Sequence, residues 1–490
     1  MESEVDGSKK YKELLDKMVM VYKQLHYLFL INLNDVFKSY HLNVLINDKL
    51  FQDTLTFISQ YNFDLHYILN TLSHNNNNSN SSNSNNNAYI NLSHEFDTLI
   101  NDPLIEQHTN TTYHHTLNHQ KQLTFKKEHE VSTFTSFLST LNISYNSIIE
   151  IGCGKAYLTP SLLNTNKDCL YIGIDMKEHL IKKQPKHIHK NKNAYVLYGN
   201  ITSLNFNSFY TEHIHPIMQS HNKPETNAFL LGLHCCGNLT SNTLKIFASA
   251  PQFTHLAIVS CCLNLLKEYI SPQAKESEVF KRYYTNIGYD SKGSFLEQTL
   301  TFEYNEHEIG YPLSKYMKDK YNEMFLSRTA RNAAMQTKNV KESITSLSYK
   351  KLLYRALLQV FFERYITELS MVYGYAKVDV ESEDTFKTYV IKALNDVATK
   401  CEDNNTKQKV HAVTTNIDQV LTEFMPMYMK YDNYLWTISF IHMRFSKLVE
   451  YIIALDRVLF LFENGVKEVK LVRLFNDMLS TRNILIYARK

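Results

Sequence analysis

The sequence predicts an α/β protein built on a largely parallel, doubly wound β-sheet, with a helical region before the sheet and a large helical insertion within it. Between residues 147 and 260, unbroken apolar runs alternate with helical segments, as expected for parallel strands covered on both faces. A glycine turn follows the first of these runs, and the stretches 10–72 and 318–465 show helical periodicity. Together these three observations indicate the fold class.

The composition indicates a globular protein of several domains. Because 490 residues are too many for one small core, we expect two or three domains. The 52 basic and 49 acidic residues leave a net charge of +3, which does not predict a broad nucleic-acid-binding surface. Seven cysteines, two adjacent pairs among them, favour free thiols in a reducing compartment. The chain begins with acidic and polar residues and has no run of 18 apolar ones, so we expect a cytoplasmic location, with a nuclear pool allowed, and no membrane partner.

The chain divides into four predicted segments. Residues 1–115 form a helical region that contains a disordered Asn/Ser tract at 74–88, because such a tract has nothing to bury. Residues 116–317 form the first part of the sheet domain, and 318–465 form a helical insertion that caps the substrate side of the sheet. Residues 466–490 contain two β-like runs joined by a short turn, which we expect to form an antiparallel hairpin that closes the edge of the same sheet.

Five strands and their connecting helices are predicted within residues 116–317. A helix that begins near Lys126 leads into the first strand, and two further helices are expected at 156–163 and near 177–184. The five predicted strands are 147–151, 169–175, 194–198, 229–233 and 256–260.

The turn after the first strand predicts a nucleoside site. Gly152 and Gly154 allow the backbone to approach a ligand closely. The turn that they form places the ligand at a helix N-terminus. Asp175, at the end of the second strand, can accept hydrogen bonds from both hydroxyls of a ribose. Tyr157 replaces the third glycine of a dinucleotide site, and Glu150 precedes the turn. This pattern fits an adenosine cofactor without a pyrophosphate and points to S-adenosylmethionine.

Other polar residues follow the remaining strands at the same edge of the sheet, where ligands of open α/β sheets bind. Asn200 and Ile201 follow the third strand, and we expect them to contact the adenine. His234 lies at the end of the fourth strand and is the best candidate for a base that removes a proton from the methyl acceptor. Lys155, next to the glycine turn, is counted with Glu150, Gly152 and Gly154 among the cofactor-binding residues.

His234 is expected to cluster with Cys236, Cys261 and Cys262, because the fourth and fifth strands are neighbours in this architecture. Three interpretations of this cluster stay open. It could bind zinc, although no C-x-x-C knuckle is present; His234 could act as a base; or the cluster could only shape the pocket wall. The structural interpretation leads, and no metal ligand is assigned.

The chain resembles the methyltransferase-like protein 25 family, over about three quarters of its length and in the right order. Segments that carry the resemblance are 126–131, 150–155, 232–240, 260–262, 310–314, 328–336, 354–356, 455–457 and 480–483. The family is similar to class I S-adenosylmethionine-dependent methyltransferases, which implies a Rossmann-like fold. A more distant similarity is to tRNA acceptor-stem 2′-O-methyltransferases. Asn238 departs from the family, which more usually has Asp, and Asn200 stands where Asp is common in methyltransferases at large.

The predicted function is therefore S-adenosylmethionine-dependent methyl transfer to RNA or protein, with the acceptor and the oligomeric state left open. The aromatic tetrad that grips an exocyclic amine is missing after the fourth strand, which disfavours adenine N6 as the acceptor. The stretch Arg328 to Arg331 could meet RNA phosphates, although arginines on helix surfaces usually meet water or carboxylates. The alternative function is a non-catalytic binding protein that retains the fold.

Overall fold

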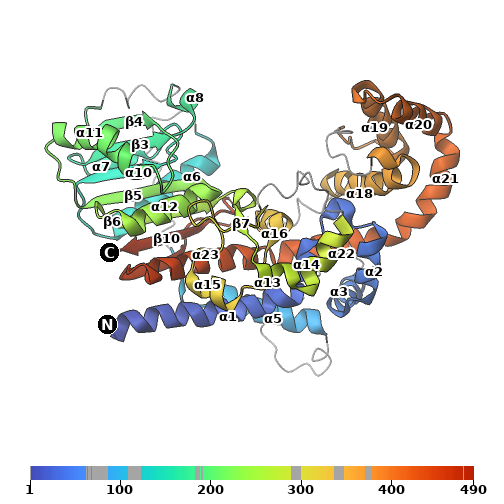
Figure 1. The fold of residues 1–490 in the computed structure, drawn as a ribbon, viewed down its shortest axis with the longest axis horizontal. Coiled ribbons are helices and arrows are strands. Elements are labelled where there is room, and N and C mark those ends of the chain that lie inside the picture. Colours follow the sequence, from blue (N-terminus) through green and yellow to red (C-terminus); the bar gives the residue numbers. More distant parts are fainter. Residues whose placement is uncertain are drawn as a thin grey trace.

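The structure is a computed structural model that describes residues 2–490 apart from 62, 64–67, 69–86, 109–122, 183–187, 189–190, 288–299, 336–346, 370–377 and 478. Figure 1 shows a sheet covered by helices at one end of the molecule and a lobe of helices at the other. The Asn/Ser tract predicted to be disordered lies outside the described residues, except for Asn87 and Ala88. The side chain of Asn87 caps the helix that begins at Ala88.

An eight-stranded sheet has the order β1-β9-β10-β6-β5-β2-β3-β4. The strands from β6 to β4 in this order are parallel, whereas β10 pairs antiparallel with both β6 and β9. The order of the chain reverses at β2, so the carboxyl ends of β2 and β5 border the crevice where ligands of such sheets bind. The bounds are β1 (Ile105–Gln107), β2 (Ser147–Ile151), β3 (Leu170–Asp175), β4 (Ala194–Tyr198), β5 (Ala228–Cys236), β6 (Phe253–Cys261), β9 (Glu468–Arg473) and β10 (Ile484–Arg489).

Helices cover both faces of the sheet, and alternate strand residues pack against them. On one face, Ile148 and Phe229 share a core with α6 (Phe125–Thr140) and α7 (Thr159–Thr165). On the other, Ile149 and Leu230 share a core with α12 (Asn238–Ser249) and α23 (Ser446–Glu463). This two-sided burial is why the strands are continuous apolar runs. The connections also contain α8 (Glu178–Ile181), α10 (Phe206–Phe209), the π-helix η2 (Tyr210–Ile214) and α11 (His215–Ser220).

The C-terminal strands β9 and β10 pair antiparallel within the same sheet, but they do not form its edge. Residues 474–483 separate β9 from β10, and β10 lies between β6 and β9. Strand β1 pairs in parallel with β9 and forms the edge instead. The prediction of a helical region over 1–115 missed this strand, because three residues with a single buried side chain carry no detectable periodicity.

In the view of Figure 1, the remaining helices lie below the sheet and at the end of the molecule opposite to it. Helix α1 (Glu2–Leu30) packs along α23 and contacts α5 (Ala88–Ile100). Helices α18 to α21 lie at the end of the molecule opposite the sheet (Figure 1). No helix among the described residues is long and apolar enough to cross a membrane. The other elements are α2 (Ser39–Asn47), α3 (Lys49–Ser59), β7 (Glu268–Tyr269), α13 (Pro272–Glu276), α14 (Glu278–Ile287), β8 (Leu300–Thr301), α15 (Lys315–Lys320), α16 (Ser327–Ala333), α18 (Leu347–Tyr365), α19 (Phe386–Lys400), α20 (Asn404–Thr415), α21 (Ile417–Tyr428) and α22 (Asp432–Arg444), with the 3-10 turns η1 (Leu33–Asp35), η3 (Leu263–Leu265), η5 (Thr367–Leu369) and η6 (Met429–Tyr431).

Candidate functional site

The glycine turn after β2 contacts the end of β3 directly. Gly152 and Gly154 have φ values of +74° and +58°, which glycine adopts at low cost. The backbone N–H of Gly152 donates to the Ile174 carbonyl at 2.8 Å. The N–H of Gly154 donates to Oδ2 of Asp175 at 2.9 Å. The turn and the carboxylate therefore lie side by side, as a shared nucleoside site requires.

A cavity of about 600 Å³ lies at this edge of the sheet. Its volume is within the range of small-molecule and cofactor pockets. All eight predicted site residues line it, namely Glu150, Gly152, Gly154, Lys155, Asp175, Asn200, Ile201 and His234. Among the described residues, those that line this cavity lie between Lys127 and Leu265. Among the described residues, the helices of 318–465 therefore do not line this cavity.

Asp175 accepts more hydrogen bonds from the protein backbone than the sequence suggested. Its second carboxylate oxygen, Oδ1, accepts a hydrogen bond of 2.8 Å from the backbone N–H of Lys177. Each oxygen of Asp175 thus already accepts one backbone hydrogen bond and keeps one further lone pair. This side chain both holds the glycine turn in place and offers acceptors to a ligand.

Glu150 is a buried acid at the floor of the cavity. Its side chain is almost fully enclosed and accepts a 2.5 Å hydrogen bond from the hydroxyl of Tyr171. Burial raises the pKa of Glu150 to about 7, although the Tyr171 hydrogen bond opposes this shift. A cationic ligand group beside Glu150 would favour its charged form.

The side chain of His234, on strand β5, contacts a carboxylate of helix α6. His234 lies at a register shift between β5 and β6 and has a φ of +68°, which is uncommon for a residue with a side chain. Its Nε2 lies 2.9 Å from Oε2 of Glu130 on α6. The other Glu130 oxygen accepts a 2.8 Å hydrogen bond from Ser480, in the segment between β9 and β10.

The charge of Glu130 is well stabilised in this setting. Burial alone would raise its pKa, but the hydrogen bond from His234, the charges of His234 and Lys127 and the hydrogen bond from Ser480 lower it to about 2. Glu130 is therefore an anion next to the imidazole over the ordinary pH range. This His–carboxylate pair is an arrangement suited to a general base.

Sequence reasoning assigned no role to Glu130 or Lys127, although both belong to a segment of the family resemblance. Lys127 lines the cavity, and its Nζ lies 3.6 Å from Oε2 of Glu130. The sequence did contain a hint that Glu130 has a specific partner, because Glu130 directly precedes Val131 on the buried face of α6. A charged residue on an apolar helix face needs a partner. The identity of that partner could not be read from the sequence.

A second cavity of about 350 Å³ lies beside the first and shares Lys127 and His234 with it. Three cations line it, contributed by Lys126, Lys127 and Arg482. Glu130 and His234 line it as well, so the His–carboxylate pair borders the second cavity, and His234 also lines the first.

The predicted cluster of His234 with three cysteines is present, but the ring of His234 points elsewhere. The sulfur atoms of Cys261 and Cys236 lie 3.2 and 3.5 Å from the carbonyl oxygen of His234, whereas the imidazole contacts Glu130. The hydrogen bond from Cys261 lowers the pKa of Cys236 to about 6. Among the described residues, Cys236, Cys261 and Cys262 bring their sulfur atoms within 4.8 Å of one another.

Two residues singled out in the sequence have structural contacts. The amide of Asn238 donates to the Glu308 carbonyl and accepts from the backbone N–H of Lys267, both at 2.7 Å. It therefore uses a donor that Asp would lack. Arg331 is fully buried and forms an ion pair with the buried Glu268, so this arginine meets a carboxylate and not a phosphate.

Comparison with known proteins supports the resemblance inferred from the sequence. Residues 126–269 match the protein family described as a methyltransferase domain. "Probable methyltransferase-like protein 25" from Homo sapiens is 24% identical over 274 residues, and its Mus musculus counterpart is 24% identical over 271 residues. Each alignment covers 54% of this chain but only 37% of the human and 38% of the mouse protein. Residues 126–269 are thus similar to a methyltransferase domain, and the chain matches well under half the length of these relatives.

Two solved structures have weaker similarity. The 23S rRNA methyltransferase ErmE is 17% identical with a TM-score of 0.20, and the match covers 26% of this chain and 45% of that chain. The plantazolicin methyltransferase BpumL, in complex with SAH, is 18% identical with a TM-score of 0.19, over 31% of this chain and 53% of that chain.

Proposed function

We propose that this protein is an S-adenosylmethionine-dependent methyltransferase that acts on RNA or protein. The observation that carries the proposal is the single cavity lined by the glycine turn, Asp175, Asn200, Ile201 and His234. A methyltransferase domain match over residues 126–269 supports the same reaction class.

The chemical groups around the cavity fit the parts of this cofactor. Glu150 offers a carboxylate to the methionine ammonium, while Lys155 and the backbone of the glycine turn suit the methionine carboxylate. Asp175 suits the ribose hydroxyls. Asn200 and Ile201 suit the adenine, and the exposed apolar side chain of Met176, which sequence reasoning did not single out, lines the same cavity. The cavity volume of about 600 Å³ accommodates a ligand of this size.

The bound cofactor supplies a methyl group already activated by its sulfonium, so the protein has to position the acceptor and manage its proton. His234 stands between the two cavities and is the proposed base for that proton. Glu130 would orient the imidazole and stabilise its cationic form after proton transfer. It is therefore a positioning residue.

The second cavity is the proposed acceptor site. Lys126, Lys127 and Arg482 place positive charge around it, which suits an anionic acceptor such as RNA. A protein acceptor with acidic side chains would meet the same groups. The cysteines are all free thiols, which fits the proposed cytoplasmic location.

A labelled-methyl assay on total cell extract, with and without ribonuclease, tests the proposal. Label that appears with wild-type protein, is lost with His234→Ala and disappears after ribonuclease treatment would support an RNA methyltransferase. Label that resists ribonuclease but not protease would indicate a protein acceptor. Cofactor binding by calorimetry without any transfer would favour a non-catalytic binding protein and overturn the enzyme proposal.

A further inference from the structure

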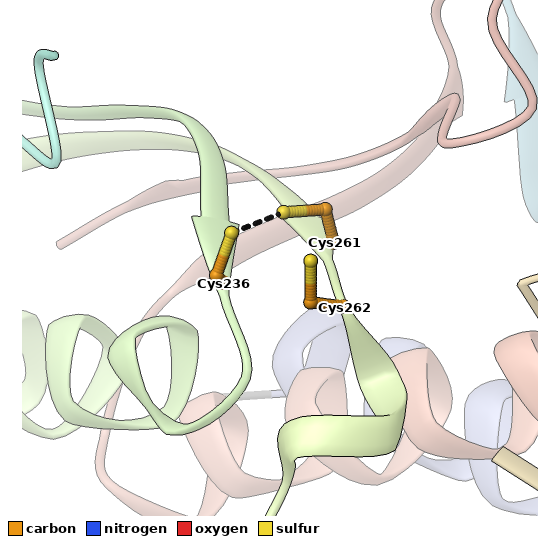
Figure 2. Close-up of side chains that lie close together, drawn as sticks. All are labelled: Cys236, Cys261 and Cys262. Atoms are coloured by element: carbon orange, nitrogen blue, oxygen red, sulfur yellow. Dashed lines mark hydrogen bonds between the residues drawn. The ribbon is translucent and has the colours of Figure 1, made fainter. Parts of the chain in front are cut away.

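Three cysteines converge at the adjoining ends of β5 and β6. Figure 2 shows the side chains of Cys236, Cys261 and Cys262 with their sulfur atoms directed toward one another. The Cys236 and Cys261 sulfurs are 2.9 Å apart, and all three lie within 4.8 Å of one another. The described cysteines also include Cys153, Cys169, Cys235 and Cys401, which do not belong to this group.

The backbone is shaped to bring the third sulfur into the group. Cys236 and Cys261 are direct partners in the pairing of β5 with β6, so their sulfurs are neighbours across the sheet. Consecutive residues of a strand normally point to opposite faces, which would send Cys262 away from Cys261. Cys262 instead has a φ of +50°, a left-handed conformation that costs energy for a residue with a side chain. This turn returns its sulfur to the side of the other two.

We propose that Cys236, Cys261 and Cys262 bind one zinc ion through three thiolates and leave its fourth coordination position open. Zinc prefers tetrahedral sulfur and nitrogen ligands, and sites with three protein ligands keep a position for water or substrate. The zinc site goes beyond methyl transfer, and only the nature of its fourth ligand rests on the proposed function.

The geometry favours a metal over a disulfide because a metal uses all three sulfurs. Two thiolates on one zinc, each about 2.3 Å from the ion, are about 3.8 Å apart. The Cys236 and Cys261 sulfurs, now 2.9 Å apart, would therefore have to move apart by less than about 1 Å. A disulfide between them would need a sulfur separation of about 2.05 Å. It would not involve Cys262, so the left-handed turn that brings the third sulfur into the group would be unexplained. Rotation of exposed Cys236 about its side-chain bonds permits the required separation.

The open position would face the proposed acceptor site. Cys236 lines the first cavity, whereas Cys261 and Cys262 line the second. Three thiolates on one divalent ion carry a net negative charge, and Arg482, which lines the second cavity with Cys261 and Cys262, can partly offset it. An acceptor atom that enters the second cavity could therefore occupy the fourth position of the ion in place of water.

Metal analysis of the purified full-length chain tests the proposal. After purification with a reductant and without added chelator, the wild-type protein should contain about one zinc ion per chain. Cys262→Ser and Cys236→Ser should each reduce the zinc content at least severalfold. Cobalt added to the chelator-treated wild-type protein should give thiolate-to-metal charge-transfer absorption, and this absorption should be weak in the two variants.

Two controls separate this site from general damage. Cys401→Ser, at the end of α19 and outside the cluster, should keep its zinc, and His234→Ala should also keep it because the imidazole is not a proposed ligand. Thermal unfolding and circular dichroism identify any variant that fails to fold, and Cys236→Ser is the gentler change because Cys236 is exposed whereas Cys262 is partly buried. Zinc-free wild-type protein that also fails to take up cobalt would overturn the proposal. A mass lower by two hydrogen atoms, from a Cys236–Cys261 disulfide under reducing conditions, would overturn it as well.

Discussion

The imidazole of His234 on β5 and the carboxylate of Glu130 on α6 form a 2.9 Å contact beside the second cavity, and His234 also lines the first. The two residues are 104 positions apart in the sequence, and their contact couples the strand end to a helix that precedes the sheet. Because Glu130 is buried and anionic, it can hold the imidazole in one orientation.

We expect His234→Ala and Glu130→Gln to lower methyl transfer in the labelled extract assay. Loss of a general base reduces rates by about 100-fold or more. Loss of a charge-assisted hydrogen bond costs about 1.5 to 3 kcal/mol, or about tenfold to hundredfold in rate. If Glu130 acts through His234, the double variant should be no slower than His234→Ala. Additive losses would contradict this coupling, and Glu128→Gln on the same helix is the matched control.

Asp175→Ala should weaken S-adenosylmethionine binding by at least about tenfold, because it removes a charged acceptor for the ribose and releases the N–H of Gly154. Isothermal titration calorimetry measures this affinity directly. Asp168→Ala, an exposed aspartate just before β3, should bind as the wild type does. Unchanged affinity in Asp175→Ala would remove the role assigned to this residue.

Glu150 should make the protein less stable as the pH rises from 4.5 to 7. Its pKa in the folded chain is about 7 against an ordinary value of 4.5, so only the folded state holds the proton in this range. The stabilisation is therefore complete below pH 4.5 and is lost as the pH rises through 7, and it amounts to about 3 kcal/mol. Glu150→Gln lacks this titration.

Urea unfolding at pH 4.5 and pH 7.5 measures the effect. The free energy of unfolding of the wild-type protein should fall between these pH values relative to that of Glu150→Gln. Parallel pH profiles for the two proteins would show that Glu150 does not titrate as its burial implies.

Asn238→Asp should destabilise the protein, although Asp is the residue more usual in the family that the chain resembles. The carboxylate cannot donate to the Glu308 carbonyl, and we expect a loss of about 1 kcal/mol, seen as a lower thermal midpoint. Asn242→Asp on the same helix provides the comparison for an added negative charge. Equal midpoints for Asn238→Asp and the wild type would show that this hydrogen bond contributes little.

Much of the lining of the first cavity could be inferred from the sequence. Glycines after an apolar strand, Asp175 after the next strand and Asn200 after the third are local patterns, and parallel strands bring their carboxyl ends to one edge. The bounds predicted for β2 and β4 agree with the structure, and the predicted helix 156–163 begins three residues later, as α7. The helix begins later because backbone φ values above zero at Gly152, Gly154 and Ala156 extend the turn that precedes it.

Contacts between distant segments could not be inferred in the same way. Glu130 meets Ser480 across 350 positions, β1 joins β9, and α18 to α21 lie at the end of the molecule opposite the sheet. Residue type and periodicity report whether a side chain is buried, because burial follows from the local pattern of apolar residues. Which partner it meets depends on how whole elements pack, and many packings bury the same residues. The apolar periodicity and glycine spacing of this chain were thus enough for the sheet, for the edge that lines the cavity and for the presence of a cysteine cluster. The partner of His234 follows from long-range packing, and the direction of the Cys262 sulfur follows from a left-handed backbone that leaves no mark in the residue pattern.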